Sequence, residues 1–240
     1  MRKITSLMVL SAVAAVCGWG MSARASNYNL SVVGAEPLSL FLGTGNTASV
    51  GNLLFTFTGF ASGNTGGNVA PTSAQIAVNA WNFPATSPAG EPGIVFTSGL
   101  WSAPNVGYVD SVINFTVTTT DGSLITDDYL TAAGSAPANS QWKVDETVSP
   151  LSVGGTLGII DVNNISGNTT STATFLPQTG LTIQKDINVL NSGIVGQGTP
   201  SITDVEQGFS TVPVPAAAWT GLSTLAGLGV MGLLRKRARA

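Results

Sequence analysis

The chain has 240 residues, of which only 9% are charged, and its formal net charge is −3. It contains no histidine and a single cysteine, Cys17. Ser-His-Asp catalysis and histidine-ligated zinc are therefore excluded, because both need an imidazole. From residue 18 onward no cysteine is present, which excludes disulfides and thiol catalysis in that part of the chain.

The N-terminal residues have the pattern of a secretory signal peptide. Arg2 and Lys3 precede an uncharged stretch, Ile4 to Val16, which is too short to span a bilayer comfortably. The small residues Ala23 and Ala25 then form a cleavage motif. We expect residues 1–25 to be a cleaved signal peptide and Ser26 to begin the mature chain.

The C-terminal residues 212–240 form a second targeting segment. The motif Val212-Pro213-Val214-Pro215-Ala216 leads into an uncharged stretch that ends at Leu234. As a helix, residues 216–234 would span about 28 Å, close to the thickness of a bilayer's hydrocarbon core. A basic tail follows, made of Arg235, Lys236, Arg237 and Arg239. Such a segment predicts one transmembrane helix with its basic end in the cytoplasm.

The order of motif, hydrophobic helix and basic tail resembles the PEP-CTERM sorting signal. That signal marks exported bacterial proteins for exosortase, a membrane-embedded processing enzyme. Val214 stands where the commonest motif has glutamate, so the match is to variant signals of the Val-Pro-Leu-Pro-Ala type. The resemblance implies cleavage near Pro213 to Ala216 and covers only the chain from Ser201 onward. An unprocessed membrane anchor is the alternative.

The charges are divided unevenly between the targeting segments and the rest. Between residues 26 and 211 only Lys143 and Lys185 oppose all twelve acidic residues, a formal charge of −10. A surface with so few cations has no electrostatic footprint for DNA or RNA. We therefore expect no nucleic-acid partner, and an acidic exterior that keeps the exported part soluble.

Residues 26–198 have the composition of an all-β domain, with short apolar runs between turns rich in Gly, Ser, Thr and Asn. Alternation predicts strands over residues 52–57, 111–119 and 181–190, and Lys185 interrupts the apolar face of the last one. Asp121-Gly122 predicts a hairpin into a return strand over residues 123–130. The fold expected is an antiparallel, jelly-roll-like β-sandwich, followed by a linker over residues 199–211.

Two acidic dipeptides, Asp127-Asp128 and Asp145-Glu146, are the candidates for a glycosidase pair. Glycoside hydrolysis needs two carboxyl groups about 5–10 Å apart. Neighbouring residues on a strand point to opposite faces, so neither dipeptide forms such a pair by itself. Solvated loop charge is the simpler interpretation, and no catalytic residue is assigned.

Calcium remains conceivable on a histidine-free acidic surface, because it binds carboxylate and carbonyl oxygens. The run from Asp161 to Gly167 resembles a calcium loop only in part, since Ile165 occupies a ligand position. A turn capped by Asp and Asn explains this run more simply. No metal ligands and no cofactor are therefore assigned.

Trp81, Trp101 and Trp142 lie beside loop-like segments. If exposed, they could stack on sugar rings; if buried, they are core residues, which is the commoner role of tryptophan. The function expected is that of an exported, non-enzymatic surface or extracellular-matrix protein. Binding of extracellular polysaccharide through these tryptophans is the alternative, and an acid-pair glycosidase is a third.

Overall fold

A computed structural model describes residues 25–43, 45–82, 91–152, 154–193 and 198–214. Strands make up most of this part, and every strand pair except β1 with β3 is antiparallel, which confirms the predicted all-β class. No helix among these residues is long and apolar enough to cross a membrane. The predicted helix at 216–234 and most of the predicted signal peptide lie outside the described residues.

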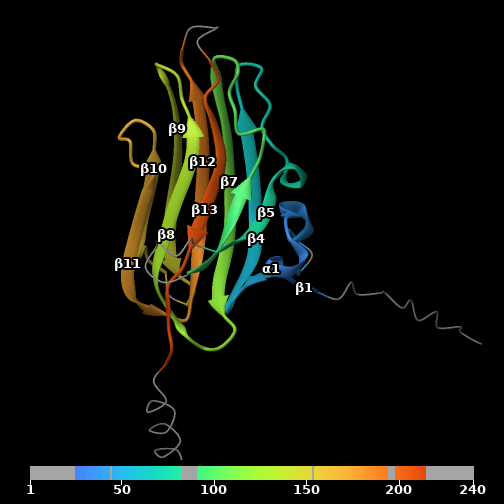
Figure 1. Cartoon of the computed structure of the whole chain (residues 1–240), viewed down its shortest axis with the longest axis vertical. Helices are drawn as coiled ribbons and strands as arrows, with labels where there is room; N and C mark the ends of the chain where they lie inside the picture. The colour runs from blue at the N-terminus through green and yellow to red at the C-terminus, as the bar shows by residue number, and fades with distance from the viewer. Residues whose placement is uncertain (1–24, 44, 83–90, 153, 194–197, 215–240) are drawn as a thin grey trace, which may run out of the picture.

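The strands form two sheets that pack face to face as two layers (Figure 1). Sheet A contains, in spatial order, β1 (Asn27–Asn29), β3 (Thr47–Val50), β4 (Leu53–Asn64), β7 (Gly107–Thr119), β12 (Gly180–Asn191), β9 (Ser140–Pro150) and β10 (Gly158–Asn163). Sheet B contains β11 (Thr170–Gln178), β8 (Leu124–Ser135), β13 (Ser201–Gly208), β6 (Pro92–Thr97), β5 (Ala77–Asn82) and β2 (Glu36–Pro37), with β14 (Thr211–Val212) also paired to β8. Three single turns of helix complete the fold: α1 (Leu30–Val33), η1 (Leu38–Leu40) and η2 (Ser73–Gln75).

From β7 to β12 the strand pairs are nested inside one another. β9 pairs with β10, β8 with β11, and β7 with β12, all antiparallel. Because β8 and β11 belong to sheet B and the other four strands to sheet A, this folded ribbon wraps around the core. Residues far apart in the sequence are thereby brought to the same depth of the core.

The core lies between the sheets and is centred on aromatic rings. Phe115 of β7 has its ring centroid 6.2 Å from that of Phe55, 5.6 Å from that of Phe57 and 6.0 Å from that of Phe96. Phe96 belongs to sheet B, so these contacts join the two layers. The predicted alternation of β4 and β7 is confirmed, since Leu53, Phe55 and Phe57, like Ile113, Phe115 and Val117, are all buried.

The predicted hairpin at Asp121-Gly122 is wrong. The turn forms, and Gly122 adopts the positive φ of 77° that favours glycine. However, β7 pairs with β4 and β12 in sheet A, whereas β8 pairs with β11, β13 and β14 in sheet B. The turn therefore carries the chain from one sheet to the other.

The predicted linker over residues 199–211 is also wrong, because it contains β13. This strand lies inside sheet B, between β6 and β8. Its apolar residues do not alternate regularly: a register shift between Ile202 and Asp204 allows both Ile202 and Val205 to face the core. The next inward side chain is polar Gln207, so the segment does not have the pattern of a buried strand.

Replacing Phe115 with alanine should strongly destabilise the fold. The change removes a fully buried ring that contacts both sheets, and we expect the free energy of unfolding to fall by about 3–5 kcal/mol. Urea unfolding followed by tryptophan fluorescence measures this loss. Leu176→Ala is the control, because Leu176 is 81% exposed and should change stability by less than about 0.5 kcal/mol. Equal effects of the two substitutions would contradict the assigned core.

Candidate functional site

A polar cluster lies inside the core, and it begins with Lys185. This lysine occupies an inward position of β12, in line with the buried residues Ile183 and Ile187. Glu146 of β9 is its direct cross-strand neighbour, and Lys185 Nζ contacts Glu146 Oε2. Both side chains are 0% exposed. The sequence-based interpretation of Lys185 as a lysine facing inward is thus confirmed, with Glu146 as its acidic partner.

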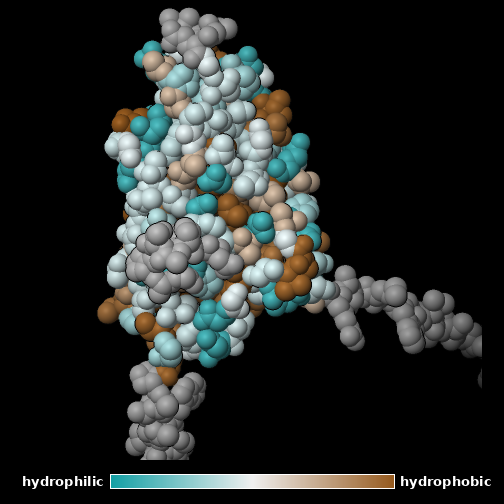
Figure 2. Space-filling view, viewed as in Figure 1, coloured by the Kyte–Doolittle hydropathy of each residue, from teal (hydrophilic) through white to brown (hydrophobic). Residues whose placement is uncertain are grey.

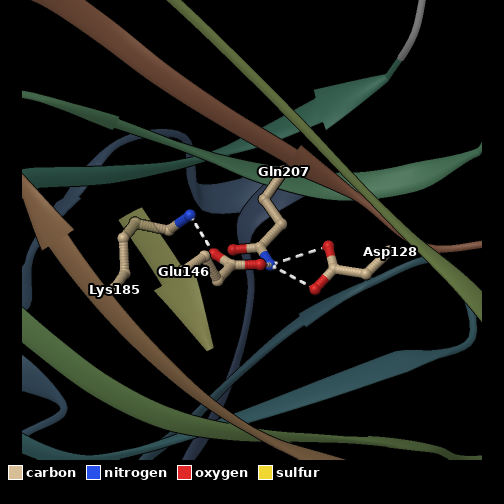
Figure 3. A network of polar contacts seen from close by, with 4 residues as sticks. All are labelled: Asp128, Glu146, Lys185 and Gln207. Atoms are coloured by element: carbon tan, nitrogen blue, oxygen red, sulfur yellow. Dashed lines mark hydrogen bonds and ion pairs between the residues drawn. The ribbon is translucent and has the colours of Figure 1, made fainter. Parts of the chain in front are cut away.

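Two residues of sheet B complete the cluster, Asp128 of β8 and Gln207 of β13 (Figure 3). Gln207 Nε2 lies 2.9 Å from Asp128 Oδ1 and 3.1 Å from Asp128 Oδ2. The same nitrogen lies 2.6 Å from Glu146 Oε1, and therefore donates across the interface between the sheets. Gln207 Oε1 has no hydrogen-bond partner among the described residues.

The surroundings of Asp128 shift the pKa of its carboxyl group. Burial, the neighbouring negative charge of Glu146 and a hydrogen bond shared with that residue raise the pKa of Asp128 well above its usual range. The Lys185 ammonium and the amide of Gln207 oppose this shift only in part. The buried Asp128 carboxyl group therefore holds its proton more tightly than an exposed aspartate does.

Asp128 and Glu146 correct the interpretation of both acidic dipeptides as solvated loop charge. One member of each dipeptide, Asp128 or Glu146, is 0% exposed, while Asp127 and Asp145 point the other way. The two buried carboxyl groups do converge, as a glycosidase pair must, but no side chain of the cluster reaches the surface. A polysaccharide cannot approach them in this fold.

The outer face of sheet B carries a pair of stacked aromatic rings. Trp81 of β5 and Tyr129 of β8 have ring centroids 6.3 Å apart and an interplanar angle of 21°. In register, Trp81 is opposite Gly93, which is opposite Gly208, which is opposite Tyr129. The two rings therefore meet above two glycines, where no side chains intervene. A Cβ atom at Gly93 would lie only 1.9 Å from the carbonyl oxygen of Gln207, so glycine is required there.

Acidic and hydroxyl groups continue along this outer face. Glu206 lies on the same face two residues from Gly208, and desolvation, followed by the charge of Asp204, raises the pKa of Glu206 to about 6. Farther along the strands is an open hollow of about 480 Å³, which is lined by Gln75, Ala77, Thr97, Ser98, Gly99, Trp101, Ser201, Ile202 and Thr203. Figure 2 shows hydrophobic side chains on the visible surface only as separate small patches.

Trp101 and Trp142 are core residues. Trp101 is 0% exposed and its Nε1 donates to Ser111 Oγ at 3.2 Å. Trp142 is 2% exposed and packs on Gly134, where a Cβ atom would come within 2.9 Å of the indole nitrogen. The commoner role of tryptophan, that of a core residue, is therefore confirmed for Trp101 and Trp142, and the alternative of sugar stacking is wrong for these two. Trp81 alone of the three is partly exposed.

The suggested calcium loop is the turn between β10 and β11. Its side chains bond to one another: Asn163 Nδ2 donates to Asp161 Oδ2 at 2.8 Å, and the backbone N–H of Ser166 donates to Asn163 Oδ1 at 2.8 Å. Gly167 follows with a φ of 68°. Within the described ranges, no group of three or more acidic side chains is placed to hold a metal ion.

The outer face of sheet A carries a row of acids. Asp161, Asp145 and Asp186 are cross-strand neighbours on β10, β9 and β12. Lys143 Nζ lies 2.7 Å from Asp145 Oδ1. Desolvation, together with a hydrogen bond to Asp110 and the charge of that residue, raises the pKa of Asp186 to about 7. This face therefore loses a proton near neutral pH.

No protein-family model matches the chain, and no curated protein matches it. A solved structure that is similar to it is the enzymatically active domain of tailspike protein 4 from bacteriophage CBA120. The two share 17% sequence identity with a TM-score of 0.28, and the alignment covers 63% of this chain and 19% of the tailspike chain. A likeness at this level carries no argument about activity.

Replacing Asp186 with asparagine should change how stability depends on pH. Its pKa is about 7 in the folded state against an ordinary value of 3.8, so the folded protein binds one more proton than the unfolded chain between these two pH values. The stability from this residue is present near pH 4 and is lost as the pH rises through about 7. Urea unfolding should therefore find Asp186→Asn more stable than the native chain at about pH 8, by ~1 kcal/mol after solvent screening, and equal to it near pH 4.

Asp121 provides a control, because its pKa is shifted in the opposite direction to that of Asp186. Hydrogen bonds from the hydroxyl and the backbone N–H of Ser123 lower its pKa, so its carboxylate stabilises the fold above the unfolded pKa. Asp121→Ala should therefore lower stability at about pH 8. A higher stability of that variant at this pH, or a pH-independent effect of Asp186→Asn, would contradict the two assignments.

Proposed function

We propose that the chain is an exported, non-enzymatic bacterial surface or extracellular-matrix protein. After delivery across the cytoplasmic membrane it folds into a jelly-roll-like β-sandwich, and it carries a C-terminal sorting signal of the PEP-CTERM type. The nested pairing of β7 to β12 supports the jelly-roll description. The partners expected from the sequence are an exosortase-type enzyme and the membrane.

One observation supports this proposal above the others: the first and last strands of the described residues lie directly beside the two processing motifs. β1 begins at Asn27, directly after Ser26, the expected first residue of the mature chain. The Ser26 backbone N–H donates to Asn46 Oδ1 at 2.9 Å, and its carbonyl accepts from the Thr47 N–H at 2.9 Å. At the other end, β14 ends at Val212, the first residue of the Val-Pro-Val-Pro-Ala motif.

Apart from Val212, the two expected targeting segments therefore lie outside the strands that the described residues form. Cleavage after Ala25 and near Pro215 would leave intact every strand that the described residues form. The C-terminal end of the described chain emerges beside β14 at the lower end of the sandwich (Figure 1). That end would face the membrane while the anchor is present, with the long axis of the strands pointing away from it.

The second candidate function is binding of a neutral extracellular polysaccharide on the outer face of sheet B. The observation that favours it is the Trp81–Tyr129 ring pair, since sugar rings stack on aromatic faces. Glu206 and the hollow that includes Thr97 and Ser201 lie along the same strands and offer hydrogen-bonding groups. An extended chain of sugars could then lie along the strands from the ring pair to the hollow.

Deleting residues 216–240 tests the sorting proposal. Without the predicted helix and basic tail, the sandwich should appear in the soluble exported fraction, whereas the full chain should fractionate with the membrane until it is processed. Intact mass of the surface-exposed protein from its native host should end near residue 215. A double variant, Pro213→Ala with Pro215→Ala, is the matched control, because it keeps the anchor and should retain Ala240. Membrane retention of the truncated chain would contradict the anchor.

Replacing Trp81 with alanine tests the polysaccharide proposal. We expect the affinity for polysaccharide, measured from the retardation of the protein in native gels that contain it, to fall about tenfold. This corresponds to ~1.4 kcal/mol for the lost aromatic contact. Tyr108→Ala is the control, since Tyr108 is an aromatic residue 37% exposed on β7 of the other sheet. Binding that the Trp81 substitution leaves unchanged would contradict this site.

A further inference from the structure

We propose that Lys185 and Glu146 condense inside the folded core to form an amide cross-link between β12 and β9, with Asp128 as the proton-transferring catalyst. The reaction joins Lys185 Nζ to Glu146 Cδ and releases one water molecule. It is an activity of the chain on itself and needs no cofactor. It goes beyond the proposed export and does not depend on it.

The reacting groups are already in contact. Lys185 Nζ touches Glu146 Oε2, and cross-strand pairing fixes the two backbones opposite each other. Condensation requires the nitrogen to reach the carboxyl carbon from about 3–3.5 Å, and a contact held by two strands of one sheet supplies this proximity permanently. The residues are 39 positions apart in the sequence, so the bond would close a long loop.

The environment favours a neutral product over the ion pair. All four side chains of the cluster are 0% exposed, and a charged pair in a dry core retains a large desolvation cost. Transfer of a proton from the Lys185 ammonium to the Glu146 carboxylate gives a neutral amine and a neutral acid, both of which suit this environment better. The free amine is the nucleophile that the reaction requires.

The remaining groups match the steps that follow attack. As Nζ bonds to Cδ, negative charge develops on Glu146 Oε1, to which Gln207 Nε2 donates at 2.6 Å. Asp128, whose protonated form is favoured by burial and which shares a hydrogen bond with Glu146, gives its proton to the departing oxygen as the Cδ–O bond breaks. Nζ then returns one proton to the Asp128 carboxylate, which restores the catalyst. The balance is one ammonium and one carboxylate converted to one amide and one water.

The positions of the chain's cations allow a sharp test. Between residues 25 and 234 trypsin has only Lys143 and Lys185 as cleavage sites. The full chain, purified and then denatured, should be cut after Lys143 but not after Lys185, because an acylated lysine is not a trypsin site. The fragment that begins at Val144 should run past Asp186 with a mass lower by one water, and fragmentation should place the link between positions 146 and 185.

Several outcomes would overturn the proposal. One is normal cleavage after Lys185 with unaltered mass. Another is a link that joins the fragment from Val144 to the preceding fragment, because this would make Asp128 the acceptor. A third is water loss confined to the preceding fragment, where Asp121-Gly122 can cyclise to a succinimide.

Asp128→Asn tests the catalyst, because it keeps the shape of the side chain while removing the transferable proton. Cross-linking should slow by about 10²–10⁴-fold, measured as the fraction of chains resistant to cleavage after Lys185 against time. Circular dichroism checks that the variant is folded, and Lys185→Met provides the reference that cannot cross-link. A folded Asp128→Asn chain that cross-links as fast as the native chain would overturn the role of Asp128.

Discussion

The fold depends on a constraint inside its core: four polar side chains, two from each sheet, must meet there. A buried lysine without its carboxylate, or a buried carboxylate without its donors, costs several kcal/mol. Lys185 and Glu146 satisfy one another within sheet A, and Gln207 connects them to Asp128 in sheet B. A shift of one sheet against the other by two residues along the strands would break the contacts between the sheets. The cluster therefore selects one alignment of the two sheets, whose inner faces are otherwise apolar.

The aromatic centre provides apolar contacts between the sheets, and the polar cluster provides the specificity. Phe55, Phe57, Phe96 and Phe115 make contacts that depend on shape but tolerate small shifts. Hydrogen bonds at 2.6–2.9 Å tolerate much less. In a domain without cysteine, this combination replaces the fixed cross-links that disulfides give many exported proteins.

Much of the local structure could be predicted from the sequence, but little of the arrangement of the strands could. The alternation of apolar and polar residues in β4, β7 and β12 was sufficient to predict which residues face inward, including Lys185. It could not name Glu146 as the partner, because that contact depends on β9 lying beside β12. Asp121-Gly122 predicts a reversal of direction, and local turn chemistry does not say which sheet the next strand joins. β13 was missed because a register shift and a buried glutamine hide its period. For the same reason, no sequence pattern linked Asp128 to Gln207, although both face a common point of the core.

The position of β13 has a consequence for the timing of folding. This strand fills the middle of sheet B, pairing with β6 and β8, yet it is among the last parts of the sandwich to be made. Until residues 201–208 arrive, β6 and β8 have no neighbour between them and the sheet has a gap through its centre. Pairings across such long separations in sequence form slowly, and here they must wait for residues 201–208. In a polypeptide threaded through a membrane from its N-terminus, sheet B would thus stay open until β13 had crossed, and would close only on the far side.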